Sequence, residues 1–366
     1  MTSKQRFITA LSRGIPDRLP VTTHHVMPYF LNTVMGGIGV QEFFDYFGLD
    51  PIKWVAAYTP DICDEDNWRV DVKTSLEQNF AVRQYRILTP KKTLTMIVQE
   101  NEYTEWVAKP LMKEKADIEI IAQYAPVPLC DVASVNQEAE AFGDRGLIRG
   151  TIPGFDVYGQ PGCWQDLAMV FGTEQLILET FHDPQWVHSA LQVFLERKQK
   201  YIMSMSGAKL DLVELGGGSA STTLISPDIF EKFVASYDAE LIELAHQMGQ
   251  RIVYHTCGGM MPILEQIADM GPEAMETFTP PSMGGDVDLK EAKRRIGDRV
   301  CMIGGFDQFH YFLNCDPSDT RKAVRRCFEE AGDDGGFILS PSDHFFDADI
   351  ECLKAFAEEA KQCTYN

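Results

Sequence analysis

The C-terminal half of the sequence repeats one unit, in which a short apolar run ends in polar or glycine residues and an amphipathic helix follows. This alternation is typical of βα units, whose strands pair in parallel. Five runs predict strands in this half: Leu210–Leu215, Arg251–His255, Ala274–Phe278, Arg299–Gly304 and Gly336–Ser340. Three earlier runs complete a set of eight: Leu19–Thr23, Ile52–Ala56 and Gly146–Thr151. We therefore predict an α/β fold, specifically a (β/α)₈ TIM barrel.

The clearest helix is expected over residues 227–248. Ser226 is a favourable N-cap, and Pro227 suits the first helical position. Gly249 is a typical C-terminal stop. Apolar residues recur between them at spacings of three and four, which predicts one buried stripe.

Residues from about Arg69 to Val107 alternate polar and apolar side chains, with a turn sequence at Thr89–Lys92. This period of two predicts a β-hairpin insertion. No linker separates it from the rest of the chain, so we interpret residues 1–366 as a single barrel domain with 69–107 as the insertion. The insertion could cover the barrel mouth or form a subunit contact, and the sequence leaves both open.

The composition limits the partners of the chain. Its 366 residues include 54 acidic and 33 basic side chains, giving a net charge of −21. Such a chain repels nucleic-acid phosphates and anionic lipids. The first residues are too polar for a signal peptide, and no run of about 18 apolar residues suggests a membrane span. We expect a cytoplasmic protein, in which nine scattered cysteines argue against a disulfide framework.

Polar side chains gather at the ends of the predicted strands, where a barrel places its active site. Candidates at these ends are Glu214, His255, Cys257, Glu276, Asp307, Asp343 and His344. For Asp307 we favour a structural role, hydrogen bonding at a helix start. Glu214, Asp343 and His344 are the candidate catalytic residues.

His255 and Cys257 are two residues apart, so an imidazole and a thiolate lie on one side of an extended backbone and can reach one ion. Glu276 follows on the next predicted strand. We therefore predict a metal site formed by His255, Cys257 and Glu276, with Asp343 as a fourth ligand. His344 could replace Asp343 or serve as a general acid. The alternative is a packed cysteine beside a hydrogen-bonded histidine, with Glu276 accepting structural hydrogen bonds.

Two further sites are weaker candidates. His24 and His25 are consecutive near the first strand, which predicts that they point to opposite faces and that at most one enters the barrel. Tyr158, in a loop, could line a pocket, although packing is the commoner role of such a residue.

Four segments carry a resemblance to a known family: SPDIF (226–230), IVYHTCGGM (252–260), DLKEAKRRIGDRVCMIGGFDQ (288–308) and GGFILSPSDHF (335–345). Together they resemble the uroporphyrinogen decarboxylase superfamily, strongly in the C-terminal half and loosely before about residue 145. The resemblance implies a (β/α)₈ barrel, often dimeric. True decarboxylases of this superfamily carry an N-terminal arginine-rich motif that holds the substrate carboxylates. Here no arginine lies between Arg18 and Arg69.

The other branch of the superfamily contains zinc-dependent methyltransferases that work with corrinoid proteins, and its mark is His-x-Cys plus a later Cys. His255 and Cys257 match this mark, whereas Asp343 stands where the later cysteine is expected. A carboxylate makes zinc a harder Lewis acid than a thiolate does. The resemblance therefore implies transfer of a methyl group from a small O-methyl compound, such as an aromatic methyl ether, to the cob(I)alamin of a corrinoid protein.

Other functions stay open on the sequence alone. The same polar cluster could serve a metal-free decarboxylase or other lyase through acid–base chemistry, and Asp343 would then mark a lost metal site. A methylcobalamin:thiol methyltransferase and a non-catalytic binding protein on a barrel scaffold are the remaining alternatives. The methyl donor, the acceptor and the direction of transfer are not determined by these residues.

Overall fold

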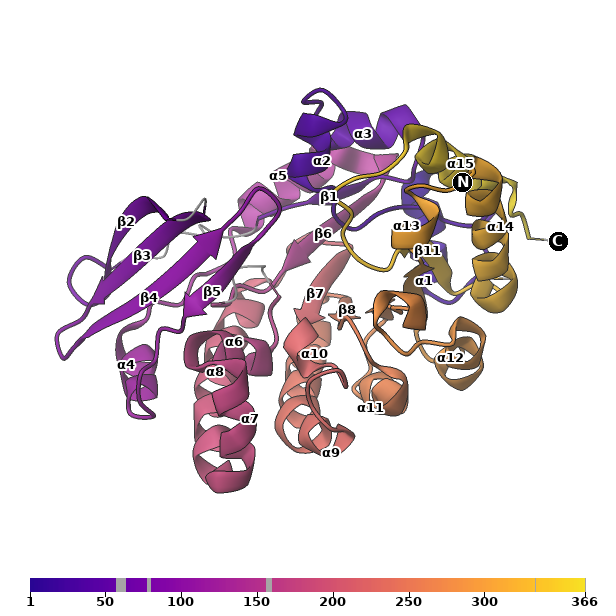
Figure 1. Ribbon diagram of the computed structural model, residues 1–366. Coiled ribbons are helices and arrows are strands. Elements are labelled where there is room, and N and C mark those ends of the chain that lie inside the picture. The colour runs from indigo at the N-terminus through magenta and orange to yellow at the C-terminus, as the bar shows by residue number, and fades with distance from the viewer. Residues whose placement is uncertain (57–63, 78–79, 156–159, 333, 366) are drawn as a thin grey trace.

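The protein is described by a computed structural model covering residues 1–56, 64–77, 80–155, 160–332 and 334–365. Its centre is a curled, seven-stranded parallel sheet that resembles a TIM barrel, with the strands in sequence order (Figure 1). The strands are β1 (Ile52–Trp54), β6 (Leu147–Thr151), β7 (Leu212–Gly216), β8 (Ile252–His255), β9 (Ala274–Thr277), β10 (Cys301–Phe306) and β11 (Phe337–Pro341). Seven of the eight predicted strands are thus confirmed to within two residues at each end.

Helices pack around the strands, mostly on the outer side of this sheet (Figure 1). In the N-terminal half they are α1 (Ser3–Leu11), α2 (Pro28–Thr33), α3 (Val40–Phe47), α4 (Asp117–Tyr124), α5 (Val132–Phe142), α6 (Cys163–Phe171), α7 (Thr173–His182) and α8 (Pro184–Ser204). In the C-terminal half they are α9 (Pro227–Phe230), α10 (Ser236–Gln247), α11 (Leu264–Asp269), α12 (Leu289–Ile296), α13 (Gln308–Tyr311), α14 (Pro317–Cys327) and α15 (Ile350–Gln362). No helix among the described residues is long and apolar enough to cross a bilayer.

The helix predicted over residues 227–248 is confirmed as one helical run. It comprises α9, a π-helical turn at Glu231–Ala235, and α10. The Ser226 side chain accepts a hydrogen bond from the backbone N–H of Ile229, as expected of an N-cap.

The eighth predicted strand, Leu19–Thr23, is wrong as a strand. Only Val21 forms a bridge, to Leu339 of β11. The N–H of Leu339 donates to the carbonyl of Pro20, and the N–H of Thr22 donates back to Leu339. Proline has no N–H to extend this ladder, and the chain bends at His24. The segment nevertheless lies beside β11 at one end of the seven-stranded sheet.

The same segment is also connected to the start of β1, through Asp50. The carbonyl of Val21 accepts a hydrogen bond from the backbone N–H of Asp50. The Asp50 side chain is 1% exposed and accepts hydrogen bonds from the Val21 N–H (3.0 Å), Ser3 Oγ (2.7 Å), Arg6 Nη1 (2.7 Å) and both terminal nitrogens of Arg18 (3.0 and 2.9 Å). One buried carboxylate therefore fixes α1 and the segment at residue 21 against β1.

The predicted insertion is larger than a single hairpin. It is a four-stranded antiparallel sheet of β2 (Arg69–Glu77), β3 (Phe80–Leu88), β4 (Thr93–Glu100) and β5 (Glu105–Lys109), which stands beside the parallel sheet (Figure 1). The predicted turn is confirmed between β3 and β4, where Thr89 and Lys92 are hydrogen-bonded. At the β4–β5 turn, Tyr103 contacts Tyr29 and Phe346, with ring centroids 4.6 and 5.3 Å away.

Replacing Asp50 should destabilise the whole fold. Asp50→Ala is expected to lower the free energy of unfolding by about 3–5 kcal/mol, because Arg6 and Arg18 would lose the buried charge that compensates them. Urea denaturation measures this loss. The matched control is Asp45→Ala, since Asp45 and its partner Arg145 are both more than half exposed. We expect the control to lose at most about 1 kcal/mol, and a similar loss in both variants would contradict the assignment.

Candidate functional site

Four charged side chains from adjacent strands meet inside the curled sheet. Arg149 comes from β6, Glu214 from β7, His255 from β8 and Glu276 from β9. All four are at most 5% exposed. His255 and Glu276 are direct partners in the parallel register of β8 and β9, which brings their side chains together. The strand pairing thus brings together His255 and Glu276 of the predicted ligand set, and Glu214, which was predicted only as a catalytic candidate, joins them.

Arg149 is the cation at the centre of this group. Its Nη1 lies 2.9 Å from Glu276 Oε2, its Nη2 also contacts Glu276 Oε1, and the same Nη2 lies 2.7 Å from Glu214 Oε2. The guanidinium lies over the ring of Trp54, 4.6 Å from its centroid. Arg149 was not among the predicted site residues. The available signal was a charged residue inside an otherwise apolar predicted strand.

The shared arginine gives the two carboxylates opposite pKa shifts. Burial raises the pKa of Glu214, and its one hydrogen bond to Arg149 does not offset that. Burial also acts to raise the pKa of Glu276, but the charge of Arg149 and the hydrogen bond from His255 outweigh it and leave the pKa well below its usual value. For His255, burial lowers the pKa, while hydrogen bonding to Cys257 and the nearby carboxylates raise it well above normal.

The His255 ring is oriented by its neighbours. Its Nδ1 lies 2.9 Å from Glu276 Oε1, and its Nε2 lies 3.4 Å from the side-chain nitrogen of Gln160. Cys257, half-buried two residues beyond β8, is a hydrogen-bond partner of the imidazole. A Cβ atom on Gly218 would lie 2.6 Å from the Cys257 sulfur, so glycine there leaves room around the thiol. An imidazole and a thiol side by side, the imidazole held by a carboxylate, are a donor set that suits zinc.

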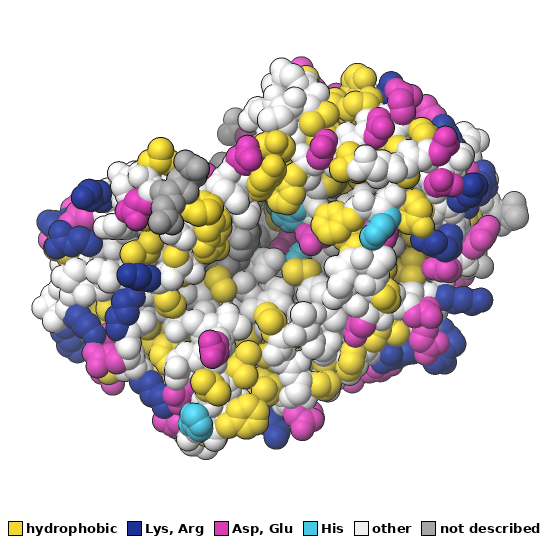
Figure 2. Space-filling view, in the orientation of Figure 1, with side chains coloured by type: hydrophobic (Ala, Val, Ile, Leu, Met, Phe, Trp, Pro, Cys, Tyr) yellow, Lys and Arg dark blue, Asp and Glu magenta, His cyan; other side chains and the backbone are white. Residues whose placement is uncertain are grey.

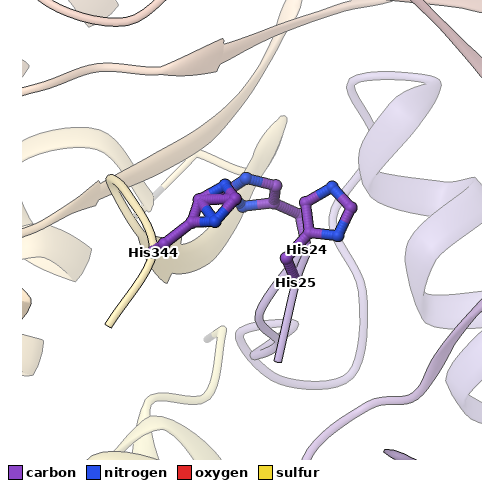
Figure 3. A group of neighbouring side chains, drawn as sticks. All are labelled: His24, His25 and His344. Carbon is purple, nitrogen blue, oxygen red and sulfur yellow. The ribbon is translucent and has the colours of Figure 1, made fainter. Parts of the chain in front are cut away.

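A second cluster, the histidine trio, contains His24, His25 and His344. Figure 3 shows the three rings converging from two segments, one before α2 and the other after β11. One ligand atom from each ring lies within 4.8 Å of the other two. The prediction that at most one of His24 and His25 faces inward is therefore wrong. Strict side-chain alternation requires a continuous strand, whereas the chain here bends at His24.

Trp54 organises the trio. Its indole N–H donates to the backbone carbonyl of His24 over 2.6 Å, and the His25 ring stacks on it at 4.7 Å with an 8° tilt. The Nδ1 of His344 lies 3.0 Å from the sulfur of Met27. Burial lowers the pKa of His24 well below normal, that of His25 to about 3, and that of His344 below its ordinary value. The three imidazoles are therefore neutral near pH 7.

The other candidates lie in varied surroundings. Asp343 is half-buried beside the trio, and its Oδ1 accepts a hydrogen bond from the backbone N–H of His344. Asp307 caps α13 and also accepts from Ser282, as its structural interpretation required. Tyr158 lies outside the described residues.

The three-residue clusters of possible ligands found in the described ranges are the histidine trio and the group of Glu214, His255 and Glu276. Neither contains Cys257 or Asp343. Figure 2 shows the molecule hollowed at its centre, with histidine and acidic side chains in the wall of the hollow. A separate cavity of about 440 Å³ lies between the antiparallel sheet and α8. Its lining includes Trp68, Tyr85, Phe155 and Arg197, and none of the candidate ligands.

Solved structures share this architecture. A methyltransferase from Methanosarcina mazei superposes with a TM-score of 0.63 at 17% identity, over 99% of both chains. A B12-independent methionine synthase from Shewanella sp. W3-18-1 gives a TM-score of 0.50 at 9% identity, over 94% of this chain and 98% of that one. At these identities the likeness is one of fold.

Sequence comparison gives the family. A family model described as uroporphyrinogen decarboxylase (URO-D) matches residues 159–363, more than half of the chain, so the protein belongs to the URO-D family. The methylcobamide:CoM methyltransferase MtaA of Methanosarcina barkeri is 30% identical over 152 residues, 42% of this chain and 41% of that protein. The uroporphyrinogen decarboxylase of Chlorobaculum tepidum is 23% identical over 185 residues, 49% of this chain and 50% of that protein. The chain thus spans half or less of these relatives.

Glu214→Gln and Glu276→Gln should shift stability in opposite directions with pH. Because the pKa of Glu214 is higher in the folded protein than in the unfolded chain, its ionisation lowers the free energy of unfolding as pH rises from the unfolded pKa through the folded pKa. The free energy of unfolding of Glu214→Gln, relative to wild type, should therefore increase as pH rises. Because the pKa of Glu276 is lower in the folded protein, its charge stabilises the fold at any pH above the pKa that it has in the unfolded chain. The deficit of Glu276→Gln should be largest near neutral pH and shrink as pH falls.

Urea denaturation between about pH 4 and about pH 8 measures both differences from wild type. Each glutamine variant is the steric control for the other, because both remove one carboxylate from the same arginine. Parallel pH profiles in the two variants would contradict the opposite pKa shifts.

Proposed function

We propose that this protein is a zinc-dependent methyltransferase that moves a methyl group from a small methylated substrate to the cob(I)alamin of a corrinoid protein. The observation that carries the proposal is the pairing of His255 with Cys257 at the end of β8, with the ring held by Glu276. The partial likeness to a methylcobamide:CoM methyltransferase supports the same reaction class. The protein would then act with a separate corrinoid-carrying partner.

In this proposal His255 and Cys257 hold zinc, and Asp343 supplies an oxygen ligand from the segment after β11. The Nδ1 of His255 contacts Glu276, so Nε2, which lies 3.4 Å from the side-chain nitrogen of Gln160, is the nitrogen that would bind the metal. Glu276 belonged to the predicted ligand set. Because its oxygens contact both Arg149 and His255, we assign it the task of orienting the imidazole. The positive charge of Arg149 offsets the negative charge of Glu276, so the Glu276 carboxylate can stay buried.

When bound, zinc would act as a Lewis acid at the donor oxygen and lower the barrier to carbon–oxygen cleavage. The methyl group would pass to the cobalt(I) of the partner's corrinoid, both electrons of the broken carbon–oxygen bond would stay on oxygen, and that oxygen would then need a proton. Among the predicted catalytic residues, Glu214 has a pKa that burial raises, which favours it as the proton donor. The lowered pKa of His344 disfavours the role of general acid first expected of it.

The substrate we propose is an O-methyl compound, in particular an aromatic methyl ether. A carboxylate in place of a thiolate ligand makes zinc favour oxygen over sulfur donors. Tyr29, Tyr103 and Phe346 form an aromatic cluster beside the loops that carry His25 and His344. Such side chains suit an aromatic ring at the mouth of the site.

Zinc content and methyl transfer test the proposal together. Protein without a histidine tag should carry close to one zinc that depends on Cys257, and Cys257→Ala should lose it. With methoxylated aromatic compounds and free cob(I)alamin, wild type should form methylcobalamin and the corresponding phenol. Cys257→Ala should be slower by at least about 100-fold, since several kcal/mol of barrier lowering would be lost.

Cys130→Ala is the matched control, because Cys130 is also a half-buried free cysteine. It should keep both zinc and activity. A wild-type protein without zinc after reconstitution, or one that never methylates cob(I)alamin with any methyl ether, would overturn the proposal. Carbon dioxide release from carboxylated substrates without zinc would favour the metal-free lyase, and thiol methylation by methylcobalamin would favour the thiol methyltransferase.

A further inference from the structure

We propose that the histidine trio of His24, His25 and His344 is a second metal site, which binds a divalent ion of the zinc class beside the site at His255 and Cys257. The His255 ring lies 5.9 Å from that of His24, so the two sites would be neighbours in one hollow. The three ring centroids lie 5.0, 5.4 and 5.2 Å apart, and one nitrogen of each ring lies within 4.8 Å of the other two. His24 is buried, and His25 and His344 are half-buried. Three imidazoles brought this close are a common ligand set for zinc.

An unpartnered nitrogen points to the ligand. The Nε2 of His24 is buried and has no hydrogen-bond partner among the described residues, and the residue is 4% exposed. A buried polar atom without a partner costs free energy. Coordination of a metal would satisfy it. Neutral imidazole is the form that binds metals.

The surroundings hold the rings as they hold metal ligands in other proteins. Trp54 fixes His24 through its backbone carbonyl and His25 by stacking. The Nδ1 of His344 contacts the Met27 sulfur, which leaves its Nε2 available. The contact at Nδ1 of His344 is of the kind that fixes the orientation and the tautomer of a ligating histidine.

The ligand type narrows the metal. Imidazole suits Zn²⁺, Co²⁺, Ni²⁺ and Cu²⁺, whereas Mg²⁺ and Ca²⁺ prefer oxygen ligands. The trio itself contains no carboxylate, so a bound ion would keep its full positive charge. Three protein ligands leave a coordination position open. That position would accept an anionic or oxygen-bearing small molecule entering the central hollow. The inference does not depend on the proposed methyl transfer.

The test is a cobalt(II) titration of metal-free protein, followed by absorption spectroscopy and elemental analysis. Wild type should bind about two equivalents, one of which gives a thiolate-to-cobalt charge-transfer band from Cys257. His344→Ala and His25→Ala should each lose about one equivalent and keep the band. Cys257→Ala should lose the band and keep the other equivalent. His182→Ala, which alters an exposed histidine at the end of α7, should bind as wild type does.

The outcomes separate this proposal from the previous one. If wild type binds a single equivalent and only the two histidine variants lose it, the trio is supported and the zinc site at Cys257 is ruled out. If only Cys257→Ala loses that single equivalent, the proposal of a metal at the trio is overturned. If both kinds of variant lose it, the two clusters form one shared site, and this also overturns the proposal, as would a wild type that binds no metal. Circular dichroism spectra matching wild type show that each variant is folded. His344, half-buried in a loop, is the variant least expected to disturb folding.

Discussion

The buried guanidinium of Arg149 is the interaction on which the centre of this protein depends. It joins three strands of the parallel sheet, because Arg149 on β6 contacts Glu214 on β7 and Glu276 on β9. Without it, two carboxylates would stay buried inside the curled sheet with little compensation, which is strongly unfavourable. Glu276 in turn holds the ring of His255. The charge balance of the core and the orientation of the candidate metal ligand therefore rest on one side chain.

Much of this arrangement follows from local sequence patterns. The βα alternation is visible in the residues, and a parallel sheet in sequence order places successive strand ends side by side. That is why the meeting of His255 with Glu276 could be predicted. Arg149 could not, because its role comes from partners 65 and 127 residues away. A single charged residue in a short apolar run gives no indication of which strands it will join.

The predictions that were wrong also concern residues whose positions depend on distant parts of the chain. The segment at Leu19–Thr23 has the composition of a strand, but Pro20 and the bend at His24 limit its pairing to one bridge. The alternation rule then fails for His24 and His25, whose positions depend on the distant Trp54. The insertion was recognised from its period of two. The contact of Tyr103 with Tyr29 depends on tertiary packing that no local pattern encodes.

The irregular chain after Thr22 has a consequence for the histidines that it carries. Asp50 and Leu339 hold the backbone at Val21 and Thr22, whereas residues 23–25 pair with no strand among the described residues, so their local unfolding free energy lies below that of the whole fold. Each opening would withdraw His24 and His25 together and leave His344 behind. By linkage, a ligand held by all three rings raises the local unfolding free energy of the segment that carries His24 and His25. Occupancy of the trio and protection of the backbone at residues 23–25 from hydrogen exchange would therefore rise and fall together.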